Sequence, residues 1–143
     1  MRKGPEIAIK RLQSQAEIEE AEYQAWGRGT KPEYIVWRYL VYHKKLKEGV
    51  DFEFQTNMFG GRRIYGGTVL DFLFPLLNMA WRVQGEQFHQ LLVKDRVHDM
   101  IVRIQLEQQG LTVVDLWVRD LLSRPKYVLD LAWNGQEVGG PVG

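Results

Sequence analysis

Two apolar segments joined by a short turn constrain the fold of this 143-residue chain more than any other feature. The segments are TVLDFLF at residues 68–74 and MAWRV at residues 79–83, and each has the length of a buried strand. Between them, PLLN at residues 75–78 contains the proline and asparagine of a turn. Strands joined by so short a turn pair in the antiparallel sense, so the sequence predicts a sheet at the centre of the fold.

Further strands and several helices surround this pair. DFEFQ at residues 51–55 alternates like a strand, and residues 111–118 form the β-branched type of buried strand. Helical patterns are expected at residues 5–26, 34–46, 89–109 and 119–132, the last broken at Pro125. Thr30 and Pro32 suit the start of the second helix, and Gly49 and Gly110 suit the ends of the second and third. The Gly- and Arg-rich residues 59–67 are expected to form a loop or hairpin turn.

The order of these elements predicts an α/β fold. A helix, three strands, a helix and a fourth strand follow an N-terminal helix. An antiparallel meander followed by a helical crossover gives a mixed sheet with helices on its faces. We expect a helical extension at residues 1–29, a core domain at residues 30–133 and a flexible tail at residues 134–143.

Composition narrows the classes of function. The chain has no cysteine, which excludes disulfide bonds, zinc knuckles and a thiol nucleophile. No segment approaches the ~18 apolar residues of a membrane span, and the N-terminal sequence lacks the apolar core of a secretory signal. We therefore expect a cytoplasmic protein, or one in a host cell or virion if the gene belongs to a phage, with no membrane partner. A net charge of +1 permits a nucleic-acid partner only if the charges are segregated.

Polar residues in and around the predicted strands form a pattern of five features. In chain order these are Glu33 in the first core helix, Asp71 after a Gly-rich approach, Phe88 and His89 after the second strand, Asp95 and Asp99 in KDRVHD, and the segment GLTVVDLW. With this order the chain resembles the restriction-endonuclease-like, or PD-(D/E)XK, superfamily. It is most similar to the very short patch repair endonucleases and the EDxHD homing endonucleases. The resemblance covers residues 31–122, about two-thirds of the chain.

The resemblance implies a restriction-endonuclease-like αβββαβ core that hydrolyses DNA phosphodiester bonds with Mg²⁺ or Mn²⁺. A hard divalent cation neutralises charge on the phosphoryl oxygens, and Mg²⁺ prefers a few carboxylates with retained waters. Asp71 is the natural ligand, because a strand fixes it and a charge beside Val69 and Leu73 must be paired or metal-bound. An ordinary outward-facing strand acid is the alternative.

The end of the second strand departs from the wider superfamily, most of whose members place Glu-x-Lys there. The corresponding residues are Arg82, Val83 and Gln84. The repair-endonuclease branch also lacks this pair, and its pattern implies the Val83 carbonyl as the second metal ligand. Glu86 could substitute as a ligand, and Gln84 could orient water. Arg82 would repel a metal ion if it pointed into the site.

The remaining candidates concern the attacking water. His89 suits a general base, because an ordinary pKa of ~6.5 permits proton transfer near neutrality. A surface histidine at a helix start is the alternative. Glu33 could hold a metal-bound water, although helix first turns favour glutamate for electrostatic reasons alone. Asp99, favoured by its spacing to Gly110 in the family, or Asp95 could orient His89 or a water.

Arg62, Arg63 and Arg82 lie near the predicted site in sequence and could hold DNA backbone phosphates. Two functions follow. The first is a metal-dependent DNA endonuclease of repair, homing or mobile-element type. The second is a catalytically inactive nuclease-fold subunit that binds DNA or joins an assembly. A homodimer, a larger nucleoprotein or phage assembly, and an α/β domain of unrelated purpose stay open.

Overall fold

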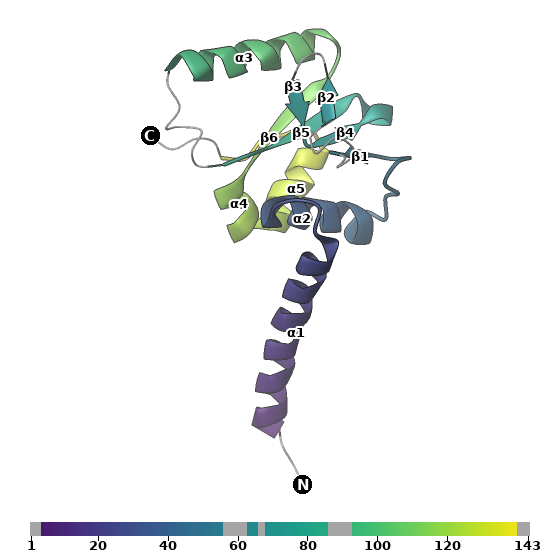
Figure 1. Ribbon diagram of the computed structural model, residues 1–143, viewed down its shortest axis with the longest axis vertical. Coiled ribbons are helices and arrows are strands. Elements are labelled where there is room, and N and C mark those ends of the chain that lie inside the picture. Colours follow the sequence, from purple (N-terminus) through teal and green to yellow (C-terminus); the bar gives the residue numbers. More distant parts are fainter. Residues whose placement is uncertain (1–3, 56–62, 66–67, 86–92, 140–143) are drawn as a thin grey trace.

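A mixed four-stranded sheet forms the centre of the computed structural model (Figure 1). The structure describes residues 4–55, 63–65, 68–85 and 93–139, with side chains for residues 14–55, 70–85 and 96–139. In spatial order the strands are β1 (Glu53–Phe54), β4 (Phe72–Phe74), β5 (Met79–Gln84) and β6 (Thr112–Trp117). β4 pairs antiparallel with β1 and β5, whereas β5 and β6 are parallel, as the meander and crossover predicted.

Helices cover both faces of this sheet (Figure 1). On one face, α2 (Lys31–Arg38), α4 (Val118–Ser123) and α5 (Pro125–Trp133) pack on an aromatic core that includes Phe54, Phe72 and Trp81. On the other face, α3 (Val93–Gln108) contributes Leu106 to a smaller core with Leu73. Neighbouring strand residues thus enter different cores, which is the alternation expected of a strand covered on both sides. The predicted helix break at Pro125 is confirmed.

The segment at residues 68–74 forms two strands, so the prediction of one continuous strand is wrong. β3 (Thr68–Leu70) pairs with β2 (Arg63–Tyr65) in a separate two-stranded sheet, while β4 joins the central sheet. β2 also lies within the segment predicted as a loop or turn. Asp71 occupies the break between the two sheets. Apolar periodicity shows which residues are extended, but it does not show where a strand changes its pairing partner.

The start of α2 follows the sequence prediction. The Thr30 side chain accepts a hydrogen bond from the Glu33 backbone N–H, and the Glu33 carboxylate accepts one from the Thr30 backbone N–H. This reciprocal capping box satisfies two donors that the first helical turn would otherwise leave unpaired. Pro32 lies in the same turn, where its missing N–H costs nothing.

The end of this helix differs from the prediction, which placed it near residue 46 with Gly49 closing it. The chain continues after α2 as a π-helix, η1 (Tyr39–His43), and then turns. Lys45 takes a left-handed backbone with φ of 61°, and the Leu46 N–H donates to the Leu40 carbonyl. Gly49, with φ of 89°, serves the next turn, where its N–H donates to Phe52. A left-handed lysine is uncommon, so the residue type gave no signal for this stop.

Two further turn predictions are confirmed. Residues 75–78 form a short 3₁₀ helix, η2 (Pro75–Leu77), followed by Asn78 in the left-handed region at φ of 50°. Gly110 ends α3 with φ of 97°, a conformation that glycine adopts without steric cost. These turns set the direction in which β5 and β6 run.

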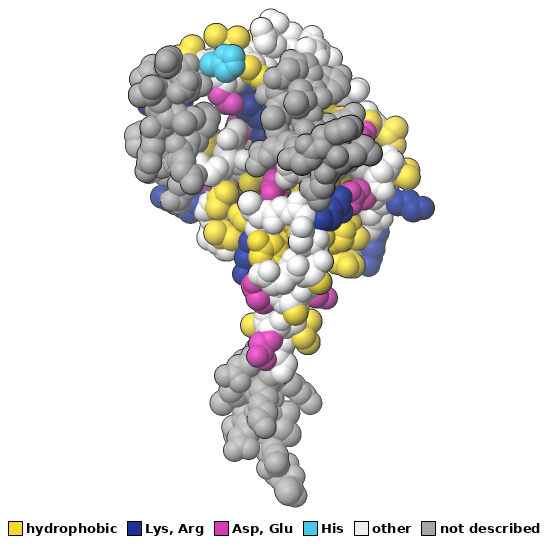
Figure 2. Space-filling model, in the orientation of Figure 1, with side chains coloured by type: hydrophobic (Ala, Val, Ile, Leu, Met, Phe, Trp, Pro, Cys, Tyr) yellow, Lys and Arg dark blue, Asp and Glu magenta, His cyan; other side chains and the backbone are white. Residues whose placement is uncertain are grey.

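The N-terminal helix, α1 (Gly4–Trp26), projects from the domain (Figure 1). Its described side chains are exposed from residue 14 to residue 22, and acidic and apolar groups lie along it (Figure 2). Trp26 attaches its last turn to the core, with ring centroids 5.3 Å from Tyr34 and 5.4 Å from Phe54. The helix predicted at residues 5–26 is confirmed. Among the described residues, no helix combines the length and apolar character needed to cross a membrane.

A polar contact fixes the connection around α2. The Arg28 guanidinium donates to both carboxylate oxygens of Glu48, at 2.8 and 2.5 Å, and the Trp37 indole donates to the same carboxylate at 2.9 Å. The hydrogen bond from Arg28 is the main cause that holds the pKa of Glu48 below its ordinary value, against the opposing effect of burial. Protonation of Glu48 therefore weakens the folded state relative to the unfolded chain.

We predict that Glu48→Gln lowers the free energy of unfolding at pH 7 by about 1 kcal/mol. Because the folded-state pKa is depressed, the contribution of Glu48 is complete above the unfolded value near 4.5 and disappears as the pH falls through the folded value. Urea unfolding at pH 7 and pH 3 should show the difference between wild type and variant shrinking in acid. Glu17→Gln, on the exposed part of α1, is the control. A difference that persists unchanged at pH 3 would contradict the prediction.

Candidate functional site

The break in the strand at Asp71 forms the centre of the candidate site. Asp71 is 2% exposed, and its Oδ2 accepts a hydrogen bond of 2.7 Å from the Val83 backbone N–H on β5. Its own backbone remains paired on both sides, with the Trp81 carbonyl at 3.2 Å and the Gln55 N–H at 3.2 Å. The strands therefore hold this carboxylate rigidly between β1 and β5. The alternative of an outward-facing strand acid is excluded.

Gln55 connects Asp71 to Glu33. Its backbone N–H donates to the Asp71 carbonyl, and its side-chain amide donates to the Glu33 carboxylate. Glu33 is 2% exposed and also accepts hydrogen bonds from the backbone and hydroxyl of Thr30, at 2.8 and 3.0 Å. Glu33, Asp71 and Val83 thus belong to one hydrogen-bonded series. The helix-start reading of Glu33 also holds, because the same carboxylate completes the capping box.

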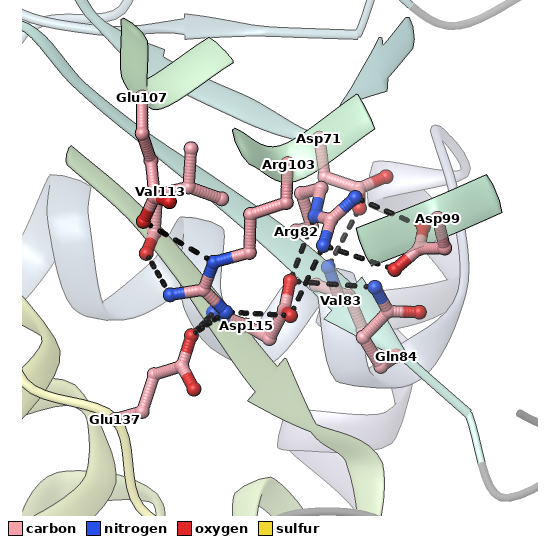
Figure 3. A network of polar contacts seen from close by, with 10 residues as sticks. All are labelled: Asp71, Arg82, Val83, Gln84, Asp99, Arg103, Glu107, Val113, Asp115 and Glu137. Carbon is pink, nitrogen blue, oxygen red and sulfur yellow. Dashed lines mark hydrogen bonds and ion pairs between the residues drawn. The ribbon is translucent and has the colours of Figure 1, made fainter. Parts of the chain in front are cut away.

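Arg82 points toward α3 and β6 (Figure 3). Its Nε and Nη2 donate to the two carboxylate oxygens of Asp115 at 2.7 and 3.1 Å, and its Nη1 and Nη2 donate to Asp99 at 3.0 and 3.3 Å. Burial lowers the pKa of Arg82, but Asp115 and Asp99 together outweigh burial and raise it above its ordinary value. Arg82 is therefore a permanent, almost fully buried cation with a carboxylate on each side.

A second arginine extends this network along β6. Arg103 of α3 donates to Asp115 at 3.0 Å and to the Val113 carbonyl at 2.8 Å, and it forms ion pairs with Glu107 and Glu137. Glu137 also accepts a hydrogen bond of 2.9 Å from the Asp115 backbone N–H. Asp115 thus contacts both arginines, and the C-terminal segment closes the network (Figure 3).

Asp115 and Glu137 are not among the residues predicted from the sequence. One signal for Asp115 was present, because it interrupts the apolar strand VVDLW in the same way that Asp71 interrupts VLDFL. An acid in a buried strand requires a partner, and that partner is Arg82. Glu137 lies in a polar segment after the last helix, where sequence offers no comparable signal.

The other predicted residues have varied outcomes. Gln84 donates to Asp115 at 3.3 Å, which joins it to the arginine network. Glu86, His89 and Arg62 lie outside the described residues. Arg63 lies on β2 and Asp95 on α3, but their side chains are outside the described part. The roles predicted for these five residues stay predictions.

The donor chemistry at Asp71 fits a hard cation. The Asp71 carboxylate supplies oxygen ligands of the kind that Mg²⁺ prefers, and one of its oxygens accepts the Val83 N–H. Within the described residues, no three acidic or histidine side chains are grouped closely enough to hold a metal ion. The fit therefore involves one carboxylate with backbone oxygen and water, to which Glu86 would add a second carboxylate.

A groove of about 550 Å³ lies among α1, α2, η1 and α5. Tyr23, Tyr34, Tyr39 and Tyr42 contribute much of its lining. It contains none of the residues predicted for the site, and its helices α2 and α5 cover the sheet face opposite to α3. The groove and the Arg82 network are therefore separate features.

Comparison with known proteins gives no match. No family model matches the chain, and neither a curated protein nor a solved structure matches it. Its function is therefore inferred from the geometry of the chain and from the chemistry of its residues.

We predict that Asp115→Ala lowers the free energy of unfolding by about 2–3 kcal/mol, because it removes the carboxylate shared by the buried Arg82 and the partly buried Arg103 while each arginine keeps another acidic partner. Urea unfolding monitored by tryptophan fluorescence measures the change. Glu107→Ala removes a carboxylate from the same network where the side chain is 45% exposed, and should cost about 1 kcal/mol or less. Equal losses in the two variants would show that Asp115 has no special position in the network.

Proposed function

We propose that this chain is a metal-dependent DNA endonuclease that hydrolyses phosphodiester bonds with Mg²⁺ or Mn²⁺. One observation carries the proposal. Glu33 and Val83 are 50 positions apart in the sequence, yet both belong to one hydrogen-bonded series through Gln55 and Asp71. The two nominated metal ligands among the described residues, Asp71 and Val83, are therefore linked to Glu33, whereas Gln84 and Asp99 belong to the arginine network. The mixed four-stranded sheet, with α3 between the parallel strands β5 and β6, also supports the proposal.

The chemistry assigns a role to each residue. The Asp71 carboxylate and the Val83 carbonyl, with Glu86, would hold the ion, and Glu33 would orient one of its waters. A bound Mg²⁺ neutralises charge that develops on the phosphoryl oxygens. His89 would take a proton from the attacking water, and Asp99 or Asp95 would orient His89. Arg62 and Arg63 would contact backbone phosphates, which fix the position of DNA without reading its sequence.

A second candidate is a catalytically inactive nuclease-fold subunit that binds DNA or joins an assembly. The observation in its favour is Arg82. This residue stands where most of the superfamily has the glutamate of Glu-x-Lys, and its guanidinium lies between Asp99 and Asp115. An internal cation next to the candidate metal site reduces the attraction of that site for a second cation.

We predict that Asp71→Asn abolishes metal-dependent nicking of plasmid DNA, because it removes the charged ligand. His89→Ala should lower the nicking rate by about 10²–10⁴-fold while folding and DNA affinity stay nearly unchanged. Raising the pH should partly restore His89→Ala, since hydroxide becomes more available, whereas raising Mg²⁺ should not. Nicking assays across pH and Mg²⁺ concentration separate these two defects.

His98→Ala is the matched control, because His98 is an exposed histidine on α3. It should nick like the wild type. Wild-type activity in His89→Ala would remove His89 from the mechanism. Failure of the purified wild type to cut duplex, mismatched, branched and single-stranded DNA would favour the inactive subunit.

A further inference from the structure

The two carboxylates on Arg82 occupy different edges of the guanidinium group. Asp115 binds the edge formed by Nε and Nη2, and Asp99 binds the edge formed by Nη1 and Nη2. The Asp115 side chain is 10% exposed and belongs to the sheet, whereas the Asp99 side chain is 29% exposed and belongs to α3. Asp115 is therefore the more buried partner of Arg82, and Asp99 is the partner nearer to solvent. Both contact the guanidinium group in Figure 3.

The edge that Asp99 occupies has the geometry of an anion-binding site. Two oxygens of one carboxylate accept from two terminal nitrogens of one guanidinium, which is the bidentate arrangement that arginine also forms with phosphate. A phosphodiester presents two non-bridging oxygens with one negative charge, as a carboxylate does. Exchange of Asp99 for a backbone phosphate thus preserves both hydrogen bonds to Arg82.

The contacts around Arg82 indicate that exchange of Asp99 for a phosphate costs little free energy. Asp115 would remain on the other edge, so Arg82 would not become an isolated buried charge. Asp115 is itself held by Arg103, Gln84 and its own backbone contact with Glu137, so it can keep Arg82 oriented without Asp99. Asp99 already contacts solvent and can be hydrated where it lies or by a change of rotamer.

We propose that Arg82 binds a DNA backbone phosphate at this edge, and that Asp99 occupies the phosphate position until DNA displaces it. The inference rests on the proposed function insofar as it takes DNA as the ligand. It gives Asp99 the role of a competing anion in place of orienting a base or a water. Asp115 becomes the residue that positions Arg82 for the phosphate.

The test is the affinity of the full chain for a fluorescein-labelled DNA duplex, measured by anisotropy in EDTA so that no cleavage occurs. Asp99→Asn keeps the shape of the side chain and removes the competing charge. It should bind the duplex about fivefold or more tightly than the wild type, which is the usual lower range for coupling between two competing interactions. An orienting role for Asp99 in catalysis predicts no such gain.

Glu107→Gln is the matched control, because it removes the same charge from the same helix but contacts Arg103 instead of Arg82. The gain should also disappear in Asp99→Asn combined with Arg82→Gln, and the slope of log affinity against log salt should fall by about 0.9 for the lost phosphate contact. If the Arg82→Gln variant does not fold, Asp99→Asn combined with Arg82→Lys replaces it in the test. Lysine keeps the charge but cannot form the bidentate contact.

Three outcomes overturn the inference. One is an equal gain in Glu107→Gln, another is a gain that survives replacement of Arg82, and the third is no duplex binding by either wild type or Asp99→Asn at low salt. The proposed endonuclease activity fails separately, by absence of nicking with Mg²⁺. A protein that does not cut DNA but shows the Arg82-dependent gain retains the phosphate site and loses the catalytic proposal.

Discussion

The buried ion pair between Arg82 and Asp115 is the interaction on which the rest of the sheet depends. The two residues are direct partners in the parallel register of β5 and β6. A slip of one residue would turn one of these two side chains to the aromatic face, which would separate the pair and leave an unpaired charge in an apolar core. The same pair attaches α3, because Asp99 and Arg103 of that helix contact its two members. One ion pair thus defines the register of two strands and the position of the helix that joins them.

Local sequence signals were sufficient for most of the architecture. The caps and turns at Thr30, Asn78 and Gly110 follow from the backbone preferences of those residue types. The break at Asp71 could not be predicted in this way, because it arises from pairing with two different sheets. The early end of the second helix is similar, since a left-handed lysine is stabilised by contacts that the sequence does not show.

The candidate site could be predicted from the sequence where a charged residue interrupts an apolar segment. Asp71 is an acid in an apolar strand, and the need for a partner is readable before the partner is known. The same reasoning applies to Asp115, although the rest of its strand follows the pattern of a buried, β-branched strand. The direction of Arg82 was left open because it depends on Asp99 and Asp115, which lie 17 and 33 positions away. Gln55 is a polar residue at the end of a predicted strand, which is ordinary in a sequence. Its contact with Asp71 follows only from the pairing of β1 with β4.

The balance of charge around Arg82 connects the two proposals. Among the described side chains, two arginines face the four carboxylates of Asp99, Glu107, Asp115 and Glu137, a formal excess of two negative charges within this network. On the proposed function, such an excess would offset the repulsion between Arg82 and a divalent cation at Asp71, but it would also repel the DNA backbone. A nuclease must bind the metal ion and the DNA at the same place. In the free protein Arg82 pairs with Asp99, and displacement of Asp99 by a phosphate would let Arg82 pair with the DNA backbone instead. If both proposals hold, Arg82 is the residue through which a site acidic enough for a metal ion would also accept DNA.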